Sequence, residues 1–403
     1  MKTSSGVRSQ KSEDRKIRNW EDKKIGILNF STSQLLNFTL LLFTFHFSLS
    51  LMGCAKKYNM YRESRILMDT FCAITVVSPS KEEAKDAIDA GFAEIKKLEN
   101  LLNYFSSESE ITAINRAAGE NPVRINRETL EIIKKAVEIA NLTNGAFDPT
   151  VGSVMRLWGF SSQDSEQSVP SEDKIKSTLR LIDYKKIKIN TSASEIFLEE
   201  KGMELDLGGI AKGYAADRAI DAIKAKGIKA ALVAIAGDIK GFGLKPDMQH
   251  WKVGVQNPRP EGNPPKSPHS PLWKRGVGED FKGEQEGLSE EDIFATLYLK
   301  DKAISTSGDY QRFFIKDGKR YHHIIDPKTG YPAPEVISVS VIAPEGYLAD
   351  GISTGVFVLG ADKGIRLLES MGLEGIIVDA NKKIFLTKNL KGKINLKKEL
   401  RNG

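Results

Sequence analysis

The chain has 403 residues, of which 40% are apolar and 28% are charged. This balance excludes a collagen-like or fully disordered chain and leaves room for one large domain or a few smaller ones. The formal net charge is +6, but residues 1–34 alone hold eight Lys or Arg against four Asp or Glu. The rest of the chain therefore lacks the strongly basic surface that nucleic-acid binding requires, and we expect no nucleic-acid partner.

Two cysteines, Cys54 and Cys72, are too few for a disulfide framework. Histidine is also scarce, with five residues in the whole chain. A structural zinc site is therefore disfavoured.

The amino terminus has the order of a secretory leader. Residues 35–51 are almost continuously apolar and follow a basic stretch. The apolar run ends in Leu51-Met52-Gly53-Cys54, which resembles a bacterial lipoprotein processing box whose cysteine carries lipid, such as palmitate. We expect a signal peptide at 1–53, lipidation of Cys54, and a tether at 54–65 that holds the body on the extracytoplasmic (periplasmic) side of a bacterial membrane. A retained membrane anchor is the alternative, because the run is at the short limit for a span.

Apolar spacing predicts the elements of the body. Val, Ile and Phe favour strands, and apolar residues three or four apart favour helices. A strand is expected over 66–77, helices over 82–104 and 128–142, a polar loop over 162–171, a strand at 205–207, a helix over 210–225, strands over 231–236 and 336–343, a helix over 347–359, and a hairpin over 376–387.

One segment breaks these patterns. Residues 258–271 hold six of the 15 prolines, and the stretch 258–292 shows little apolar periodicity. We expect a flexible surface insertion there, in which Trp273, Lys274 and Arg275 could form a contact patch. Residues 391–403 are expected to be a basic C-terminal tail.

Strands and helices alternate without a regular βαβ rhythm, which favours an α+β fold with mixed, mainly antiparallel sheets and packed helices. Two glycine patterns fail as nucleotide loops. Gly208 and Gly213 have the spacing of a phosphate loop, but Tyr214-Ala215 follow instead of Lys-Ser/Thr. Gly241-Phe242-Gly243 lacks the third glycine of a dinucleotide fingerprint.

The first candidate site residues are Asp350 and Thr354, which are four positions apart on a predicted helix and so lie on one face. A carboxylate and a hydroxyl suit Mg²⁺, which takes one or two protein carboxylates and leaves other positions to water and phosphate. The alternative is structural: an Asp stabilised near the helix N-terminus, and a Thr hydroxyl bonded back to a carbonyl.

The segment 204–214, ELDLGGIAKGY, leads through a glycine turn into a helix. Its glycines permit close approach to a ligand, the helix N-terminus favours anions, and Lys212 adds a positive charge. A tight turn with Lys212 in solvent is the alternative.

His322 and His323 are adjacent on a predicted strand and should point to opposite faces. They are not expected to chelate one ion together. One of them could act as a general base, because the pKa of histidine lies near neutrality. The alternative is a buried histidine that bonds to a carbonyl.

A fourth segment, 144–152, mixes turn residues with aromatic side chains that could line a flat-ring pocket, as could Tyr104-Phe105. The alternative is a helix stop followed by core aromatic residues.

Several motifs together resemble the FAD:protein FMN transferases, the ApbE-type family. They are Met68-Asp69-Thr70-Phe71, the run from Tyr104 to Ile111, NGAFDPTVG, ELDLGGIAKGYAAD, AISTSGDYQRFF at 303–314, HIIDPKTG, and ADGISTGVFVLG at 349–360. The resemblance covers 66–390, which implies one transferase domain of T-fold-like architecture over that range, with the Pro-rich insertion outside every motif.

The resemblance also implies roles for matching residues. It implies Mg²⁺ (or Mn²⁺) ligands at Asp350, Thr354 and Gly209, the glycine offering only its carbonyl, and His323 as the group that activates the acceptor hydroxyl. The implied FAD contacts are Met68, Tyr104, Ala146, Phe147, Asp148, Asp206, Lys212 and Ile324.

The family moves FMN from FAD to a threonine hydroxyl of a partner flavoprotein and releases AMP. The implied partners are FAD as substrate and an acceptor flavoprotein, a membrane redox subunit. The same residues would also serve a Mg²⁺-dependent FAD pyrophosphatase that gives FMN and AMP. A non-catalytic FAD-binding lipoprotein would leave Asp350, Thr354 and His323 without a task, and a solute-binding lipoprotein would need two similar lobes, which the sequence lacks.

Overall fold

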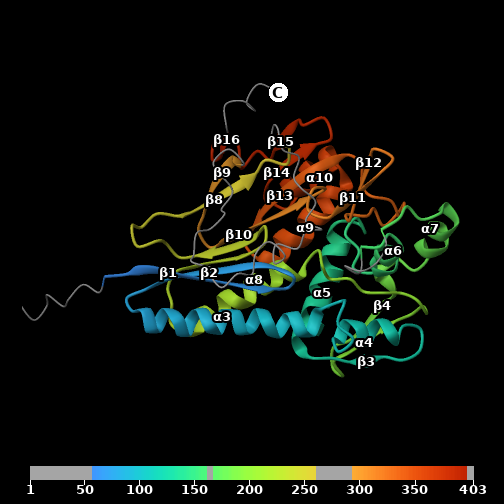
Figure 1. Cartoon of the computed structure of the whole chain (residues 1–403), viewed down its shortest axis with the longest axis horizontal. Helices are drawn as coiled ribbons and strands as arrows, with labels where there is room; N and C mark the ends of the chain where they lie inside the picture. Colours follow the sequence, from blue (N-terminus) through green and yellow to red (C-terminus); the bar gives the residue numbers. More distant parts are fainter. Residues whose placement is uncertain (1–56, 161–166, 260–292, 397–403) are drawn as a thin grey trace, which may run out of the picture. The chain divides into compact units, whose positions relative to one another are not determined.

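The computed structural model describes residues 57–160, 167–259 and 293–396. The expected signal peptide, Cys54 and residues 260–292 of the insertion lie outside this part. From Tyr58 onward the chain is organised around an eight-stranded antiparallel sheet with the order β1-β2-β6-β7-β10-β13-β14-β15 (Figure 1). The strands are β1 (Asn59–Leu67), β2 (Thr70–Ser78), β6 (Ala231–Ile235), β7 (Asp238–Phe242), β10 (Lys302–Gly308), β13 (Val336–Ala343), β14 (Glu374–Asp379) and β15 (Ile384–Leu386).

The first hairpin corrects two expectations. The strand expected over 66–77 is the end of β1, a turn and most of β2, and residues 59–65 of the expected tether belong to β1. Met68 and Asp69 form the turn with φ angles of 53° and 54°, a left-handed conformation uncommon for residues other than glycine. Asp69 is a residue type that tolerates this conformation, whereas Met68 gives no signal of a turn.

Helices cover one face of the large sheet, and Figure 1 shows α3 running along β1 and β2. Their apolar stripes meet the sheet in the main core, which includes Phe92, Tyr214 and Phe357. The helices are α3 (Lys81–Leu102), α8 (Ala211–Ala225), α9 (Gly346–Leu359) and α10 (Ala361–Ser370), with α5 (Arg127–Leu142) packed on α9. The four helices expected from periodicity are therefore confirmed with shifts of one or two residues at their ends.

Helices α8 and α9 approach each other at a pair of glycines. A Cβ atom on Gly213 would lie 2.1 Å from the carbonyl oxygen of Gly346 and 2.7 Å from Cβ of Asp350. Only glycine fits this contact, and the contact sets the distance between Lys212 on α8 and Asp350 on α9.

A small three-stranded sheet covers the other face around a second core with Trp251 and Phe294. Its strands are β8 (Trp251–Gln256), β9 (Ile293–Leu299) and β16 (Asn395–Leu396). The start of the expected C-terminal tail is therefore not free, because Asn395 and Leu396 pair with β9.

The remaining elements lie beyond one end of the sheet. They are α4 (Glu110–Arg116), β3 (Val123–Arg124), α6 (Gly152–Leu157), α7 (Glu172–Leu179), the 3-10 turn η1 (Tyr184–Lys186), β4 (Ile187–Asn190), β5 (Glu195–Leu198), β11 (Phe313–Lys316) and β12 (Lys319–His322). Trp158, Phe160 and Ile325 are in a third apolar cluster in this region.

The prediction of a strand at 205–207 is wrong. These residues belong to no strand, and the neighbouring Glu204 forms only an isolated bridge with Val151. The α+β class with mainly antiparallel sheets is confirmed. Among the described helices, none has the length and apolar character needed to cross a bilayer.

Candidate active site

Asp350 and Thr354 face β10 from one side of α9, as the helical spacing predicted. Oδ2 of Asp350 accepts a hydrogen bond from the amide N–H of Gly213 at 3.0 Å, and its Oδ1 lies 3.4 Å from the Ser305 hydroxyl. Thr354 Oγ1 lies 3.3 Å from the Ser307 hydroxyl. Ser305 and Ser307 are two positions apart on β10 and therefore share a face.

Gly209 lies against the same helix. A Cβ atom built on it would be 3.1 Å from Thr354 Oγ1 and 3.3 Å from the ring of Phe147. The structure thus brings together the three positions expected to hold a divalent cation, although they come from the glycine turn and from α9.

Sequence reasoning missed Asp238, the first residue of β7. Its side chain is buried, its Oδ2 lies 3.2 Å from Nζ of Lys212, and it accepts a short hydrogen bond from Ser305. Ser305 therefore connects the two buried carboxylates. The only sequence signal was the pair Gly237-Asp238 directly after the strand expected over 231–236, which is also what an ordinary turn contains.

Burial and the neighbouring charge of Asp238 raise the pKa of Asp350 to about 7, against the opposing effect of Lys212. Burial disfavours the charge of Lys212, but Asp238 and Asp350 raise its pKa above the ordinary value. Two buried carboxylates face one half-buried ammonium, so this group of three carries an unbalanced negative charge when all are ionised.

A divalent cation fits this cluster. Oδ1 of Asp350 has only the long contact to Ser305, whereas both oxygens of Asp238 are engaged by Ser305 and Lys212. Within the described residues, no three or more His, Cys, Asp or Glu side chains converge as a metal site. One or two carboxylates beside hydroxyl groups are instead the hard-oxygen donor set of Mg²⁺ or Mn²⁺.

The two histidines point to different environments, as strand alternation predicted. Nε2 of His322 donates to the carbonyl of Ala333 at 3.0 Å, and its Nδ1 accepts from the amide of Ile324 at 3.3 Å. Both ring nitrogens of this buried histidine are therefore engaged in hydrogen bonds with the backbone. Burial lowers its pKa to about 4, so it stays neutral.

His323 is held differently. Its Nδ1 lies 3.2 Å from the carbonyl oxygen of Arg312, and a carbonyl only accepts, so Nδ1 carries the proton and Nε2 carries the basic lone pair. Burial and the positive charge of Arg312 lower the pKa of His323 well below its ordinary value, with Lys212 a further cause. This imidazole is neutral at physiological pH and can accept a proton.

Arg312 lies between several of these groups. Its guanidinium donates a short hydrogen bond to the carbonyl of Phe160, and burial lowers its pKa against the attraction of Asp206 and Asp69. The β1–β2 turn and the glycine turn therefore meet around this arginine.

The segment 204–206 is anchored from two sides. Glu204 accepts a hydrogen bond from the Tyr104 hydroxyl at 2.5 Å and pairs with Arg156 at 2.5 Å. The amide of Asp206 donates to the carbonyl of Pro149 at 2.8 Å, and its own Oδ1 accepts from the amide of Gly208 at 2.8 Å. Tyr104 and Asp206, both expected FAD contacts, thus fix the approach to the glycine turn.

The turn after α5 holds three expected FAD contacts. Ala146 and Phe147 are buried, with Phe147 beside Gly209. Both carboxylate oxygens of Asp148 are engaged locally: Oδ1 by the amide and hydroxyl of Thr150 and Oδ2 by the amide of Tyr184. These hydrogen bonds favour a structural role for Asp148 in shaping the turn.

Two other expected FAD contacts are Met68, in the β1–β2 turn, and Ile324. The amide of Met68 donates to Glu99 at 2.7 Å, and Ile324 is buried directly after His323. The FAD roles of Met68 and Ile324 stay predictions.

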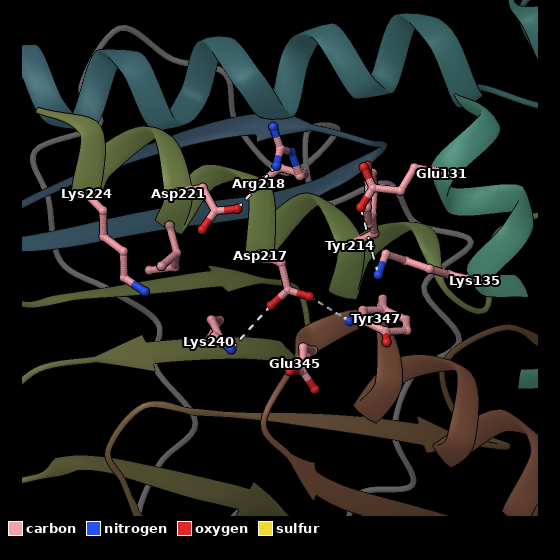
Figure 2. A pocket seen from close by; sticks show the side chains of 11 residues that line it. Glu131, Lys135, Tyr214, Asp217, Arg218, Asp221, Lys224, Lys240, Glu345 and Tyr347 are labelled. Carbon is pink, nitrogen blue, oxygen red and sulfur yellow. Dashed lines mark hydrogen bonds and ion pairs between the residues drawn. The ribbon is translucent and has the colours of Figure 1, made fainter. Parts of the chain in front are cut away.

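A cavity of about 190 Å³ is lined by the side of α8 that carries Asp217 and Asp221, and by Lys240 and Tyr347 (Figure 2). There Asp217 accepts hydrogen bonds from the amides of Gly346 and Tyr347 at 2.7 and 3.0 Å and pairs with Lys240 at 3.4 Å. Asp217 thereby holds the N-terminus of α9, the helix that carries Asp350. This cavity does not contain the candidate catalytic residues.

The sequence of this chain is similar, over most of its length, to proteins named FAD:protein FMN transferase. A FAD:protein FMN transferase from Treponema pallidum is 30% identical over 348 residues, covering 82% of this chain and 88% of the relative. One from Klebsiella pneumoniae is 30% identical over 333 residues, covering 82% and 92%.

Solved structures of ApbE proteins are also similar to this fold. The ApbE protein of Thermotoga maritima superposes with a TM-score of 0.72 at 33% identity, covering 83% of this chain and 99% of the other. The flavin transferase ApbE of Vibrio cholerae gives 0.69 at 25% identity, with the same coverage. The ApbE family model matches residues 68–377, a range that contains every predicted FAD, metal and catalytic residue, and the chain therefore belongs to the ApbE family.

Proposed function

We propose that this enzyme transfers the FMN half of FAD to a threonine hydroxyl of an acceptor protein, releases AMP and depends on a divalent cation. Its relatives are named FAD:protein FMN transferases, and flavin transfer is what the family match supports. The observation that carries the chemical step is the neutral His323, whose Nδ1 bonds to Arg312 and leaves Nε2 as the base.

The threonine oxygen attacks the phosphorus on the FMN side of the diphosphate, and its proton passes to Nε2 of His323. The bond from that phosphorus to the bridging oxygen breaks, and AMP leaves with the electron pair. A threonine hydroxyl is a weak nucleophile without a base, and a positioned base contributes typically about 10²–10⁴-fold.

Charge neutralisation is the other requirement. Lys212, held by Asp238 at 3.2 Å, is positioned to attract the diphosphate of FAD. Asp350 and Thr354, with the carbonyl of Gly209, are the proposed ligands of Mg²⁺ or Mn²⁺. Such a cation, when bound, stabilises negative charge on phosphoryl oxygens.

We also propose that Cys54 is lipidated after removal of residues 1–53, which would place the enzyme on the extracytoplasmic face of a bacterial membrane. The sequence Leu51-Met52-Gly53-Cys54 supports this proposal. The acceptor would then be a flavoprotein of the same compartment, a membrane redox subunit.

The test incubates the protein with FAD, Mg²⁺ and a candidate acceptor, followed by mass spectrometry of the acceptor and quantification of AMP. An added FMN mass on a threonine, with one AMP per modified acceptor, is the expected result. Free FMN and AMP without modified acceptor would make the protein a FAD pyrophosphatase instead. FAD binding without any AMP would make it a flavin carrier.

A further inference from the structure

One face of the β1–β2 hairpin presents apolar side chains to solvent. Tyr58, which directly precedes β1, and Met60 and Ile66 within β1 are 46%, 54% and 58% exposed, and an even number of positions separates each of them from the others. Alternate residues share a face of a strand. Phe71, which is 39% exposed, pairs directly with Ile66 and so extends this face onto β2. We call these four residues the β1 face.

The opposite face of the same hairpin is covered by the main core and by α3. Tyr61 and Leu67 pack against the main core, and the Arg65 guanidinium lies 4.3 Å from the ring centroid of Phe92 on α3. The exposed apolar residues are therefore a feature of one face. The other residues of β1 on that face are Arg62 and Ser64, so it carries no carboxylate from this strand.

The β1 face begins close to the proposed lipid attachment point. Cys54 and Tyr58 are four positions apart, a span of at most about 14 Å even when fully extended. Lys56 and Lys57 lie within that span. Basic residues at this position are attracted to anionic lipid headgroups, and the short connection keeps any weak contact at high effective concentration.

We propose that the β1 face lies on the surface of the bilayer that holds the lipidated Cys54, so that β1 runs along the membrane. The proposal rests on the lipidation of Cys54 and on no property of the transfer reaction. A bilayer interface suits this surface because tyrosine, methionine, isoleucine and phenylalanine contact the headgroup and acyl boundary while Arg62 contacts lipid phosphates.

The orientation matters for the active site. The nine residues of β1 span about 30 Å, from the anchored end to the Met68–Asp69 turn. Asp69 at that turn is close enough to Arg312 to influence its pKa, and Arg312 holds His323. With β1 along the membrane, the Met68–Asp69 turn also lies at the bilayer, whereas with β1 upright that turn would be about 30 Å away from it.

The test uses the full chain, with its own Cys54, in vesicles of phosphatidylethanolamine and phosphatidylglycerol that contain lipids brominated on the acyl chains. M60W and I66W place an indole at each end of the β1 face, and I315W is the matched control on β11, where Ile315 is 64% exposed. Unsubstituted protein supplies the tryptophan background. We expect brominated lipid to quench the added fluorescence of M60W and I66W, and not that of I315W.

Quenching of M60W alone would overturn the proposal in favour of an upright strand. Equal quenching of all three variants would overturn the proposal, because the membrane would then contact other parts of the protein as well. Quenching of none would overturn it in favour of a β1 face covered by protein. If C54S protein is released from vesicles while the unsubstituted protein is retained, the anchor is established separately from the orientation.

A functional readout separates this inference from the proposed activity. We expect I66E to transfer FMN to a soluble acceptor peptide at the unsubstituted rate, and to an acceptor embedded in the same vesicles about fivefold more slowly. Equal slowing with both acceptors would contradict the membrane role. Failure of the unsubstituted protein to modify any acceptor would instead refute the proposed function and leave the quenching result standing.

Discussion

Nζ of Lys212 lies 3.2 Å from Oδ2 of Asp238, a carboxylate that is almost completely withdrawn from solvent. The lysine comes from the first turn of α8 and the aspartate from the start of β7. A long flexible cation is thereby held at one point, beside the turn that contains Gly209. Asp238 does not need to touch FAD to affect its binding.

The first prediction concerns Asp238 as a positioning residue. Asp238→Asn keeps the shape but removes the charge that holds Lys212, so we expect metal-free FAD affinity to fall about 10–100-fold, the range seen when supporting groups are lost. Titration of FAD fluorescence measures this affinity. Lys212→Met should weaken FAD similarly, and the double variant should be no weaker than Lys212→Met.

Asp221→Asn is the matched control, because Asp221 is an exposed carboxylate on the same helix that pairs with Arg218 at 3.2 Å. It should bind FAD normally. If Asp238→Asn binds metal-free FAD normally but loses Mn²⁺ in paramagnetic resonance titrations, Asp238 is itself a metal ligand and the positioning role is wrong.

The second prediction ranks the two histidines. His323→Ala should retain FAD binding and slow transfer about 10²-fold or more, because it removes the proposed base. His322→Ala should slow transfer far less and lower the free energy of unfolding by about 1–3 kcal/mol, because it abandons the carbonyl of Ala333 and the amide of Ile324. Single-turnover kinetics and urea unfolding measure the two effects, and the opposite ranking would assign the base to His322.

The third prediction concerns Asp350 in the transfer reaction. Asp350→Ala removes the only carboxylate among the proposed ligands, so transfer should be abolished and the remaining FAD binding should no longer respond to Mg²⁺. Flavinylation assays over a range of Mg²⁺ concentrations test this. Normal transfer by the variant would remove Asp350 from the metal site.

The fourth prediction follows from the pKa of Asp350, which burial and Asp238 raise from 3.8 to about 7. The folded protein holds this proton more tightly than the unfolded chain, so stability in the absence of divalent cations should fall as pH rises from about 4 to about 7 and then level off. Asp350→Asn cannot titrate and should lack this decline. Urea unfolding with chelator at pH 5 and pH 8 compares them, and parallel losses in both proteins would contradict the assignment.

The fifth prediction tests the contact between α8 and α9. Gly213→Ala places a methyl group 2.1 Å from a backbone oxygen of Gly346, which cannot move aside without moving α9. We expect a loss of about 1–3 kcal/mol in the free energy of unfolding, accompanied by weaker Mn²⁺ binding through displaced Asp350. Gly91→Ala on α3 is the control, because its nearest neighbour is the flexible end of Ile74 at 2.8 Å. Equal losses would show that α9 adapts.

Helices α3, α5, α8 and α9 and strand β13 follow the expected ranges closely. Periodicity identified helices such as α3 and α5 because each buries one regular stripe, whereas β13 is a continuous apolar run with all eight residues buried. The segment 204–207 was predicted to contain a strand because its buried Leu205 and Leu207 alternate with polar residues. Its backbone instead forms hydrogen bonds with the Asn115 side chain and the Pro149 carbonyl, and not with a neighbouring strand. Apolar alternation reports burial on one side and cannot show whether a neighbouring strand is present.

The candidate site shows the same limit. Asp350 and Thr354 could be paired because helical geometry is local. Asp238 could not, because its partners Lys212 and Ser305 are 26 and 67 residues away and are joined to it only by the sheet and α8. Residue spacing alone could not rank His322 and His323. The family resemblance assigned the base to His323, and the different carbonyl partners of the two rings, Ala333 and Arg312, depend on the fold.

The opposite orientation of His322 and His323 constrains how this chain can change in length. Strand β12 pairs with β11 across the short turn at Asp317–Gly318. Inserting a single residue into β12 would turn every following side chain to the other face, so that neither His322 nor His323 would keep its present carbonyl partner. Changes in chain length that preserve both contacts should therefore be confined to the turn at Asp317–Gly318.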